Sequence, residues 1–166
     1  MKRVLITGMS GAGKTAVIRE LASRGYPAHD LDTPEWSEWI EAAPADGLTP
    51  VQGKDWVWRE DRVRALLSGP GDGMLFVGGC AENMSRLFPL INCIILLSAP
   101  VETILERLEA RSAGGYGHAG EERRKVVELI ATIEPLLRQS ADHEIDTRRP
   151  VCATVDEILR ISAGVR

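Results

Sequence analysis

The stretch that decides the fold is Gly8-Met9-Ser10-Gly11-Ala12-Gly13-Lys14-Thr15. It matches the pattern G-x-x-x-x-G-K-[ST], which holds phosphate groups when it lies between a strand and a helix. An apolar run, Arg3 to Thr7, precedes it, and an amphipathic pattern follows it from Lys14 to Arg24. Glycines let successive backbone N–H groups point at an anion, and the start of the helix adds partial positive charge. We therefore expect all eight residues to bind the phosphates of a nucleotide.

Two side chains of this motif have expected roles in phosphoryl transfer. Lys14 can reach the β- and γ-phosphates, and the hydroxyl of Thr15 can ligate Mg²⁺. The competing interpretation is a glycine-rich turn with a solvated lysine, but the flanking strand and helix favour phosphate binding. The motif therefore predicts ATP and Mg²⁺ as cofactors.

Short apolar runs alternate with helical patterns in the rest of the chain, which is typical of a parallel sheet covered by helices. The continuous aliphatic run Cys93 to Ser98 indicates a central strand that is buried on both faces. Further strands are expected at Arg3 to Thr7, Tyr26 to Leu31, Met74 to Val77 and His143 to Thr147. We therefore predict one α/β domain, residues 1–166, with a five-stranded parallel sheet.

The helices are predicted from the spacing of their apolar residues. They are expected at Lys14 to Arg24, Val101 to Arg111, about Glu121 to Gln139, and around Val155 to Leu159. Pro135 should kink or split the third of these, because proline lacks the N–H that a helix interior uses.

Length, charge and cysteine count restrict the class of protein. A chain of 166 residues fits a single domain, and a net charge of −4 argues against general electrostatic binding to nucleic acid or anionic lipid. Three cysteines without C-x-x-C spacing suggest neither a disulfide framework nor a zinc site. No apolar run is long enough to cross a bilayer. We expect a cytoplasmic monomer or homodimer that binds no nucleic acid and no membrane.

Other classes of nucleotide-binding protein need elements that this sequence lacks. GTPase switches carry D-x-x-G and N-K-x-D elements, and large motor or remodelling ATPases need a longer chain. A small kinase or a nucleotide-dependent binding protein remains. The missing acidic residue after Met74 to Val77 favours the binding protein.

Asp30 and Asp32 lie two residues apart at the carboxyl end of the second expected strand, where parallel sheets place their ligands. If the strand geometry continued, both side chains would point to the same side. A carboxylate beside the acceptor hydroxyl can orient it and take its proton. Alternatively, these residues only precede a helix that is capped by Thr33 and has Pro34 at its first position.

Arginines on two segments could contact anions. Arg59 and Arg62 lie i, i+3 on an expected helix and could clamp an anionic acceptor, or form a solvated face with the neighbouring acids. Arg111 precedes a glycine-rich segment that Arg107, Arg123 and Arg124 also flank. We predict a lid at about residues 111–124 that neutralises charge and excludes water; a solvent-facing helix is the alternative.

All four tryptophans, Trp36, Trp39, Trp56 and Trp58, fall in one short stretch. Trp36 and Trp39 would share a helical face. Ordinary packing is expected for at least two of the four rings, and one or two could stack on a planar substrate.

The N-terminal phosphate-binding motif, Asp30-Leu31-Asp32, and Arg111 before a glycine-rich segment together resemble the small P-loop kinases typified by shikimate, gluconate and adenylate kinases. The resemblance covers nearly the whole chain. It implies an adenylate kinase-like P-loop NTPase fold of three layers, with a short lid and a helical acceptor-binding insertion at about residues 33–68. Arg111 would pack on adenine, and Arg149 lies where related kinases place an adenine-contacting loop.

Several positions are similar to shikimate kinases in particular. That family has a D-x-D motif whose first aspartate helps to hold the Mg²⁺ shell and whose second contacts the acceptor hydroxyl, which implies these roles for Asp30 and Asp32. Its aromatic-arginine pair, which binds substrate, is matched by Trp58-Arg59. Its glycine triplet is matched in part by Gly78-Gly79-Cys80.

The chain departs from the shikimate kinase pattern at three places. Cys80 replaces the third glycine, Arg62 stands where an acidic residue is expected, and the R-P-L-L of the lid is absent. With W-V-W-R-E-D, the G-G-C turn and R-S-x-x-x-Y-G, the whole pattern resembles a group of small actinobacterial-type P-loop ATPases related to these kinases.

We therefore expect ATP- and Mg²⁺-dependent phosphorylation of a hydroxyl on a small metabolite. The expected catalytic residues are Lys14, Asp32 and Arg111, the expected metal ligands are Thr15 and Asp30, and the expected acceptor contacts are Asp32, Trp58, Arg59, Gly78 and Gly79. A nucleoside or nucleotide kinase is the second hypothesis, and an ATP-binding switch without acceptor turnover is the third.

Overall fold

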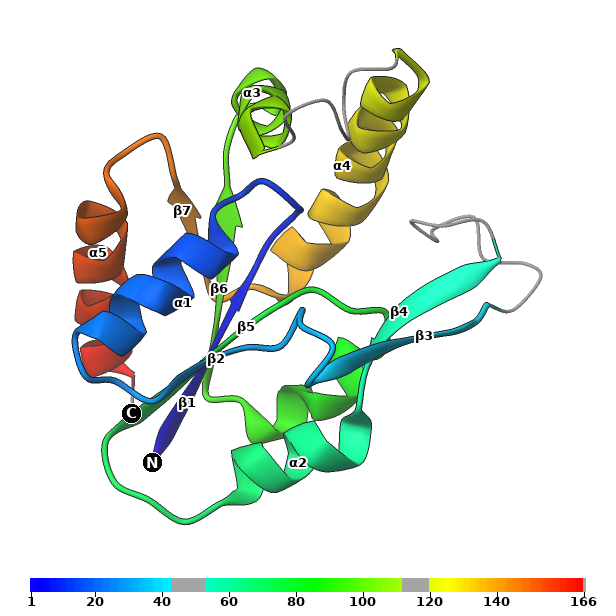
Figure 1. Cartoon of the computed structure of the whole chain (residues 1–166). Coiled ribbons are helices and arrows are strands. Elements are labelled where there is room, and N and C mark those ends of the chain that lie inside the picture. The colour runs from blue at the N-terminus through cyan, green and yellow to red at the C-terminus, as the bar shows by residue number, and fades with distance from the viewer. Residues whose placement is uncertain (43–52, 112–119, 166) are drawn as a thin grey trace.

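A five-stranded parallel sheet forms the centre of the protein (Figure 1). The computed structural model describes residues 1–42, 53–111 and 120–165. The strands are β1 (Lys2–Thr7), β2 (Ala28–Asp30), β5 (Met74–Gly78), β6 (Cys93–Ser98) and β7 (His143–Asp146), in the spatial order β2-β5-β1-β6-β7. All five predicted strands are present, so the predicted sheet is confirmed.

The register of the parallel strands brings their carboxyl ends to one edge. Ile6 pairs with Gly78, Asp30 pairs with the same Gly78, and Thr7 pairs with Leu96. Loops that leave these strands therefore start at about the same level. This edge holds both the phosphate-binding motif and the two aspartates.

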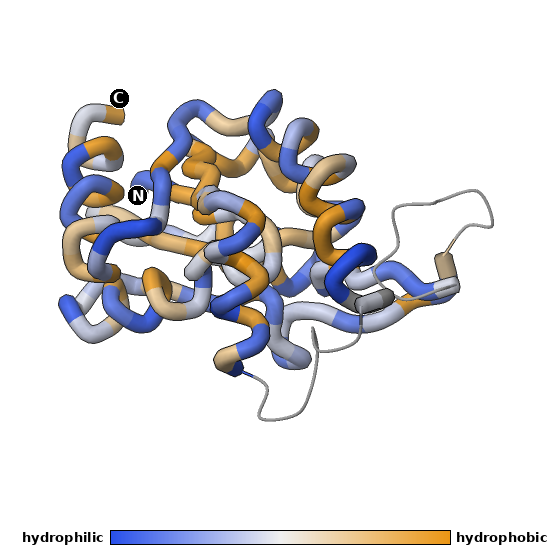
Figure 2. The backbone as a smooth tube through the Cα atoms, turned by 90° about the horizontal axis from the view of Figure 1, so that it is seen from above, coloured by the Kyte–Doolittle hydropathy of each residue, from blue (hydrophilic) through white to orange (hydrophobic). Residues whose placement is uncertain are grey.

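Helices cover both faces of the sheet, because alternate side chains of each strand point to opposite sides. Ile6, Phe76 and Ile95 pack with α1 (Lys14–Ser23) and α5 (Val151–Gly164) in one apolar cluster. The second cluster joins the other face to α2 (Glu60–Ser68), the 3₁₀ helix η1 (Met84–Leu90), α3 (Val101–Arg111) and α4 (Gly120–Ser140). Figure 2 shows the apolar strands inside and hydrophilic stretches on the surrounding helices. No helix within these ranges is long and apolar enough to span a membrane.

Helix α4 differs from its prediction, because it runs without a break from Gly120 to Ser140 and includes Pro135. The sequence predicts either a kink or a split at Pro135, and of these two the split is wrong. Buried residues on both sides of the proline, Ile130 and Leu137, pack into the same apolar cluster. This packing stabilises both halves of the helix as one element.

The tryptophan-rich segment also differs from its prediction, since its first part is a hairpin. β3 (Ser37–Glu41) pairs antiparallel with β4 (Lys54–Trp58), and Trp39 faces Trp56 across the pair with 4.8 Å between ring centroids. The expectation that Trp36 and Trp39 share a helical face is wrong, because cross-strand aromatic contacts favour the hairpin here. Helical structure begins only at α2. Most of the loop between the two strands lies outside the described residues.

Gly78 provides a test of how closely α1 packs on the sheet. A Cβ atom at this position would lie 2.6 Å from Cγ1 of Ile18, so we expect Gly78→Ala to lower the free energy of unfolding by about 1–3 kcal/mol through overpacking. Urea unfolding measures this cost. The double variant Ile18→Ala/Gly78→Ala should lose less unfolding free energy than the sum of the losses in the two single variants, because removal of the Ile18 side chain removes the clash.

Gly120 is the matched control, since a Cβ there would meet nothing within 4 Å. Gly120→Ala should leave the unfolding midpoint nearly unchanged. Additive costs for Gly78→Ala and Ile18→Ala would contradict the close contact between them.

Candidate active site

The phosphate-binding motif, Gly8 to Thr15, forms the turn between β1 and α1. A Cβ at Gly8 would lie 2.4 Å from the carbonyl oxygen of Leu97, so only glycine lets the turn pass this close to β6. The turn is closed by a 3.1 Å hydrogen bond from the Ala12 N–H to the Met9 carbonyl. Gly13, with φ of 104°, directly precedes α1.

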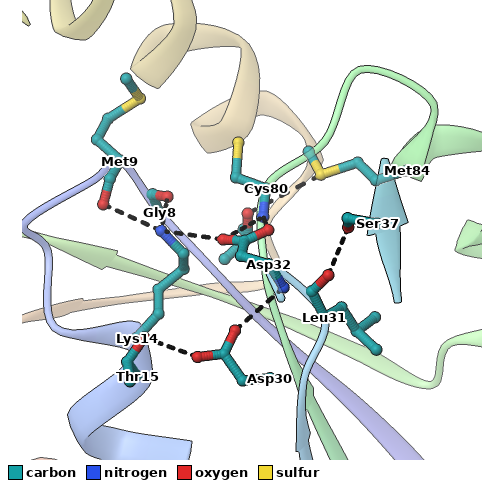
Figure 3. Close-up of polar contacts among 11 residues, drawn as sticks. Gly8, Met9, Lys14, Thr15, Asp30, Leu31, Asp32, Ser37, Cys80 and Met84 are labelled. Carbon is teal, nitrogen blue, oxygen red and sulfur yellow. Dashed lines mark hydrogen bonds and ion pairs between the residues drawn. The ribbon is translucent and has the colours of Figure 1, made fainter. Parts of the chain in front are cut away.

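The side chain of Lys14 reaches back across this turn (Figure 3). Its Nζ donates to the carbonyl oxygens of Gly8 at 2.7 Å and Met9 at 3.2 Å, and lies 3.7 Å from Oδ2 of Asp32. Two residues with predicted catalytic roles thus form an ion pair beside the turn.

Thr15 and Asp30, the two predicted metal ligands, are also in contact. The Thr15 hydroxyl donates to Oδ2 of Asp30 at 2.7 Å, while Oδ1 of Asp30 accepts the backbone N–H of Asp32 at 3.1 Å. Hydroxyl and carboxylate oxygens suit Mg²⁺, which usually takes one or two carboxylates together with phosphate oxygens and water. The residues that the structure describes contain no cluster of three or more acidic, histidine or cysteine ligands.

The helix-capping alternative for the two aspartates is wrong. Residues 33–36 form a single turn before β3, so no helix begins at Thr33. The Thr33 hydroxyl instead donates to the carbonyl of Asp30. Asp30 contacts α1 through Thr15, and Asp32 contacts the turn through Lys14.

Asp32 is partly buried and its pKa lies above the ordinary value of 3.8. Burial is the main cause, because it disfavours the charged carboxylate. The ammonium of Lys14 and the backbone N–H of Cys80, which donates at 3.0 Å, partly offset this increase. The carboxylate is therefore more basic than a surface aspartate, as suits a group that accepts a proton.

Gly79 and Trp58 form the floor beside Asp32. A Cβ at Gly79 would lie 2.8 Å from Oδ1 of Asp32 and 3.1 Å from the Trp58 ring. Trp58 is buried, and Asn83 holds its backbone with hydrogen bonds to its N–H and carbonyl, each 2.9 Å. The sequence offers no pattern by which Asn83 could have been found. Gly78 lies one residue earlier in β5, where it packs on Ile18 and accepts a hydrogen bond from Leu31.

The two arginines expected to clamp an anionic acceptor are paired on the outside of the insertion. Arg59 contacts Glu38 at 2.9 Å, and Arg62 contacts Glu35 at 2.6 Å while it lies over the ring of Trp36. The partners of both arginines therefore come from the hairpin and the turn before it.

Arg107 contacts the outer side of the phosphate-binding turn. Its guanidinium donates to the Gly11 carbonyl at 3.2 Å and to the Thr147 carbonyl at 2.6 Å, and the Thr147 hydroxyl donates to Ala12 at 2.9 Å. Two sequence features could have indicated these contacts. Arg107 lies beside the apolar stripe of α3, and Thr147 follows β7 at the edge of the sheet where ligands bind.

Arg149 and Arg111 are the two other residues predicted to contact the nucleotide, and both lie near Arg107 and Thr147. Arg149 is two residues beyond Thr147 and donates to the Asp146 carbonyl. Arg111 is exposed at the end of α3. The predicted lid continues into residues 112–119, which lie outside the described part of the chain.

A cavity of about 640 Å³ opens beside Lys14 and Asp32. Its lining comes from the phosphate-binding turn, the β3-β4 hairpin, η1 and α4. The apolar lining includes Met9, Trp39, Trp56, Met84, Phe88 and Ile130. The cluster of tryptophans in the sequence indicated the contribution of the hairpin to this cavity, but the contribution of α4 was not predicted.

Comparisons with known proteins agree with this geometry. Residues 4–128 match the family model described as an AAA domain. A shikimate kinase from Syntrophus aciditrophicus (strain SB) is 30% identical, with 96% of this chain and 90% of that protein covered. A dephospho-CoA kinase from Porphyromonas gingivalis is 27% identical, with 97% and 93% covered.

A solved structure shares the fold at lower identity. The shikimate kinase from Acinetobacter baumannii in complex with shikimate superposes with a TM-score of 0.64 at 22% identity, covering 100% of this chain and 96% of that chain. The chain therefore belongs to the AAA-domain family and is a small P-loop kinase of the shikimate and adenylate kinase-like group.

Proposed function

We propose that the protein transfers the γ-phosphoryl group of ATP to a hydroxyl of a small metabolite, in a reaction that depends on Mg²⁺. The observation that carries this proposal is the Lys14–Asp32 pair, with 3.7 Å between its charged atoms, at the mouth of the cavity. A phosphate-binding cation and an acceptor-orienting carboxylate are thus adjacent. The reacting groups would meet where the turn ends and the cavity begins.

The chain's own residues mainly position the reactants and stabilise charge. The backbone N–H groups of the turn and Lys14 would hold the phosphates. Asp32, with its raised pKa, would accept a hydrogen bond from the acceptor hydroxyl and take its proton as the new bond to phosphorus forms. Arg107 would hold the turn in shape, and we propose that Arg111 and Arg149 contact ATP from the same side.

Thr15 and Asp30 would hold Mg²⁺, since their oxygens already meet at 2.7 Å beside the turn. When bound, the ion neutralises charge on the phosphate oxygens. The hydrogen bond from Asp32 N–H to Asp30 keeps this carboxylate in place.

A nucleoside or nucleotide acceptor is the second hypothesis. It is favoured by the Trp39–Trp56 pair, which lines the cavity and could stack on a base. A panel of hydroxyl compounds, nucleosides and nucleotides separates the hypotheses through acceptor-dependent ADP release. ATP binding with no acceptor-dependent turnover would favour the switch.

Asp32→Asn tests the acceptor-orienting role. We expect the variant to bind ATP as the wild type does but to lose transfer by about a hundredfold or more, because the amide cannot take the proton. ATP affinity is measured by calorimetry and transfer by acceptor-dependent ADP release. Asp142→Asn, in the turn before β7, is the control and should keep wild-type turnover. Wild-type turnover in Asp32→Asn would overturn the assignment.

Asp30→Asn tests the metal site. Loss of the carboxylate charge should raise the Mg²⁺ concentration needed for half-maximal activity by about tenfold to a hundredfold, as measured by Mg²⁺ titration at saturating ATP. Asp156→Asn, a change at an exposed residue that pairs with Arg24, should leave the titration unchanged. An unaltered Mg²⁺ requirement in Asp30→Asn would contradict the role of this residue.

The pH dependence of kcat/KM tests the pKa of Asp32. Transfer needs the deprotonated carboxylate, so activity should fall as pH decreases through a pKa that lies above 3.8. Asp142→Asn, which lies outside the cavity lining, should show the same acid limb as the wild type. An acid limb centred at or below 3.8 would contradict this electrostatic account.

A further inference from the structure

The side chains that line the cavity are mostly apolar, unlike those expected in a site for a small anionic acid. Aromatic or sulfur-containing side chains come from the turn, the hairpin and η1, and one face of α4 adds aliphatic residues such as Ile130 and Ile133. A volume of about 640 Å³ lies within the roughly 300–1,000 Å³ that small-molecule sites usually have. The cavity thus suits an acceptor with a substantial apolar body.

Two apolar residues of the lining remain about half exposed to water. Trp39 is 46% exposed and Leu136 is 48% exposed, and both line the cavity. Exposed apolar area is unfavourable, and a ligand that covers it gains about 25 cal/mol per Å². The rings of Trp39 and Trp56 are in contact on the hairpin, with their planes tilted by 56°, so a flat ligand can pack against the face of one of them.

The charges around the cavity are unfavourable for an anion. Of the described residues that line it, Lys14 is the one cation, whereas Asp32, Asp55 and Glu82 are acidic. Lys14 is needed at the phosphates. A carboxylate or phosphate on the acceptor would therefore meet repulsion from like charges without a compensating partner.

Three arginines on neighbouring elements do not relieve this repulsion. Arg59 and Arg62 are engaged by Glu38 and Glu35, and neither residue lines the cavity. Arg138, at the end of α4, pairs with Glu134 and Glu144. These three arginines thus already pair with glutamates outside the cavity.

We infer that the acceptor has a flat, apolar body and no anionic group, and that it enters this cavity with its hydroxyl against Asp32. The inference rests on the proposed function, of which it names the substrate class. Hydroxyl or amine groups on the acceptor would donate to the acidic residues of the lining.

Matched pairs of acceptors test this inference. Hydroxymethyl compounds built on one, two and three fused aromatic rings are each compared with the analogue that also carries a ring carboxylate. Binding is measured by calorimetry in the presence of ADP, and transfer by acceptor-dependent ADP release, with shikimate as an additional anionic probe. We expect the neutral members to bind at least about tenfold more tightly than their carboxylates.

Ile133→Arg supplies a cation on the cavity side of α4, at a partly exposed position. It should improve binding of the carboxylates and abolish the preference for neutral compounds. Val127→Arg, at a 41% exposed position of α4 outside the lining, is the matched control and should keep that preference. Trp39→Ala should weaken the neutral compounds by about tenfold, while Trp36→Ala should not.

The outcomes separate this inference from the proposed function. Equal or tighter binding of the carboxylates by the wild type, or transfer to shikimate alone, would overturn the inference and leave the kinase reaction intact. Preferential binding of the neutral compounds, without transfer to any acceptor, would count against the kinase reaction, and these compounds would then be ligands of the cavity and not acceptors. Failure of all the neutral compounds to bind would overturn the inference.

Discussion

Parallel pairing of β1 with β5 and β6 is the constraint on which the rest of the structure depends. Because Ile6, Gly78 and Asp30 share one level in the sheet, the phosphate-binding turn and the segment that carries Asp32 leave the sheet side by side. Gly8 lets the turn pass Leu97, and Lys14 can then reach Asp32. The sheet brings the charged groups together before any ligand contributes.

The segment after β2 determines which side chains face the cavity beside this sheet. In place of a helix, a hairpin presents two tryptophans to the cavity, and the neighbouring arginines are held by glutamates on the outside. Membership of a kinase family accounts for the phosphate-binding turn, while the hairpin and α4 line the cavity that we propose for the acceptor.

Most of the sheet and the phosphate-binding turn could be predicted from the sequence, because both depend on local patterns. The aliphatic run at Cys93–Ser98 predicts a strand buried on both faces, and the spacing from Gly8 to Thr15 predicts a turn between a strand and a helix. The hairpin could not be predicted, since Trp39 and Trp56 are neighbours only through a long connection. The roles of Asn83 and Arg107 also depend on contacts between distant segments, which leave no periodic pattern.

The hydrogen bonds that join Arg107 and Thr147 to the phosphate-binding turn can form only after a long stretch of chain has been synthesised. Thr147 and Ala12 are 135 residues apart in the chain, yet they share a hydrogen bond. During synthesis Ala12 is added 135 residues before Thr147, so the motif is complete before the residue that supports it exists. The growing chain therefore carries a recognisable nucleotide motif long before that motif is held in its final shape, and the last strand couples completion of the sheet to the final shape of the nucleotide site.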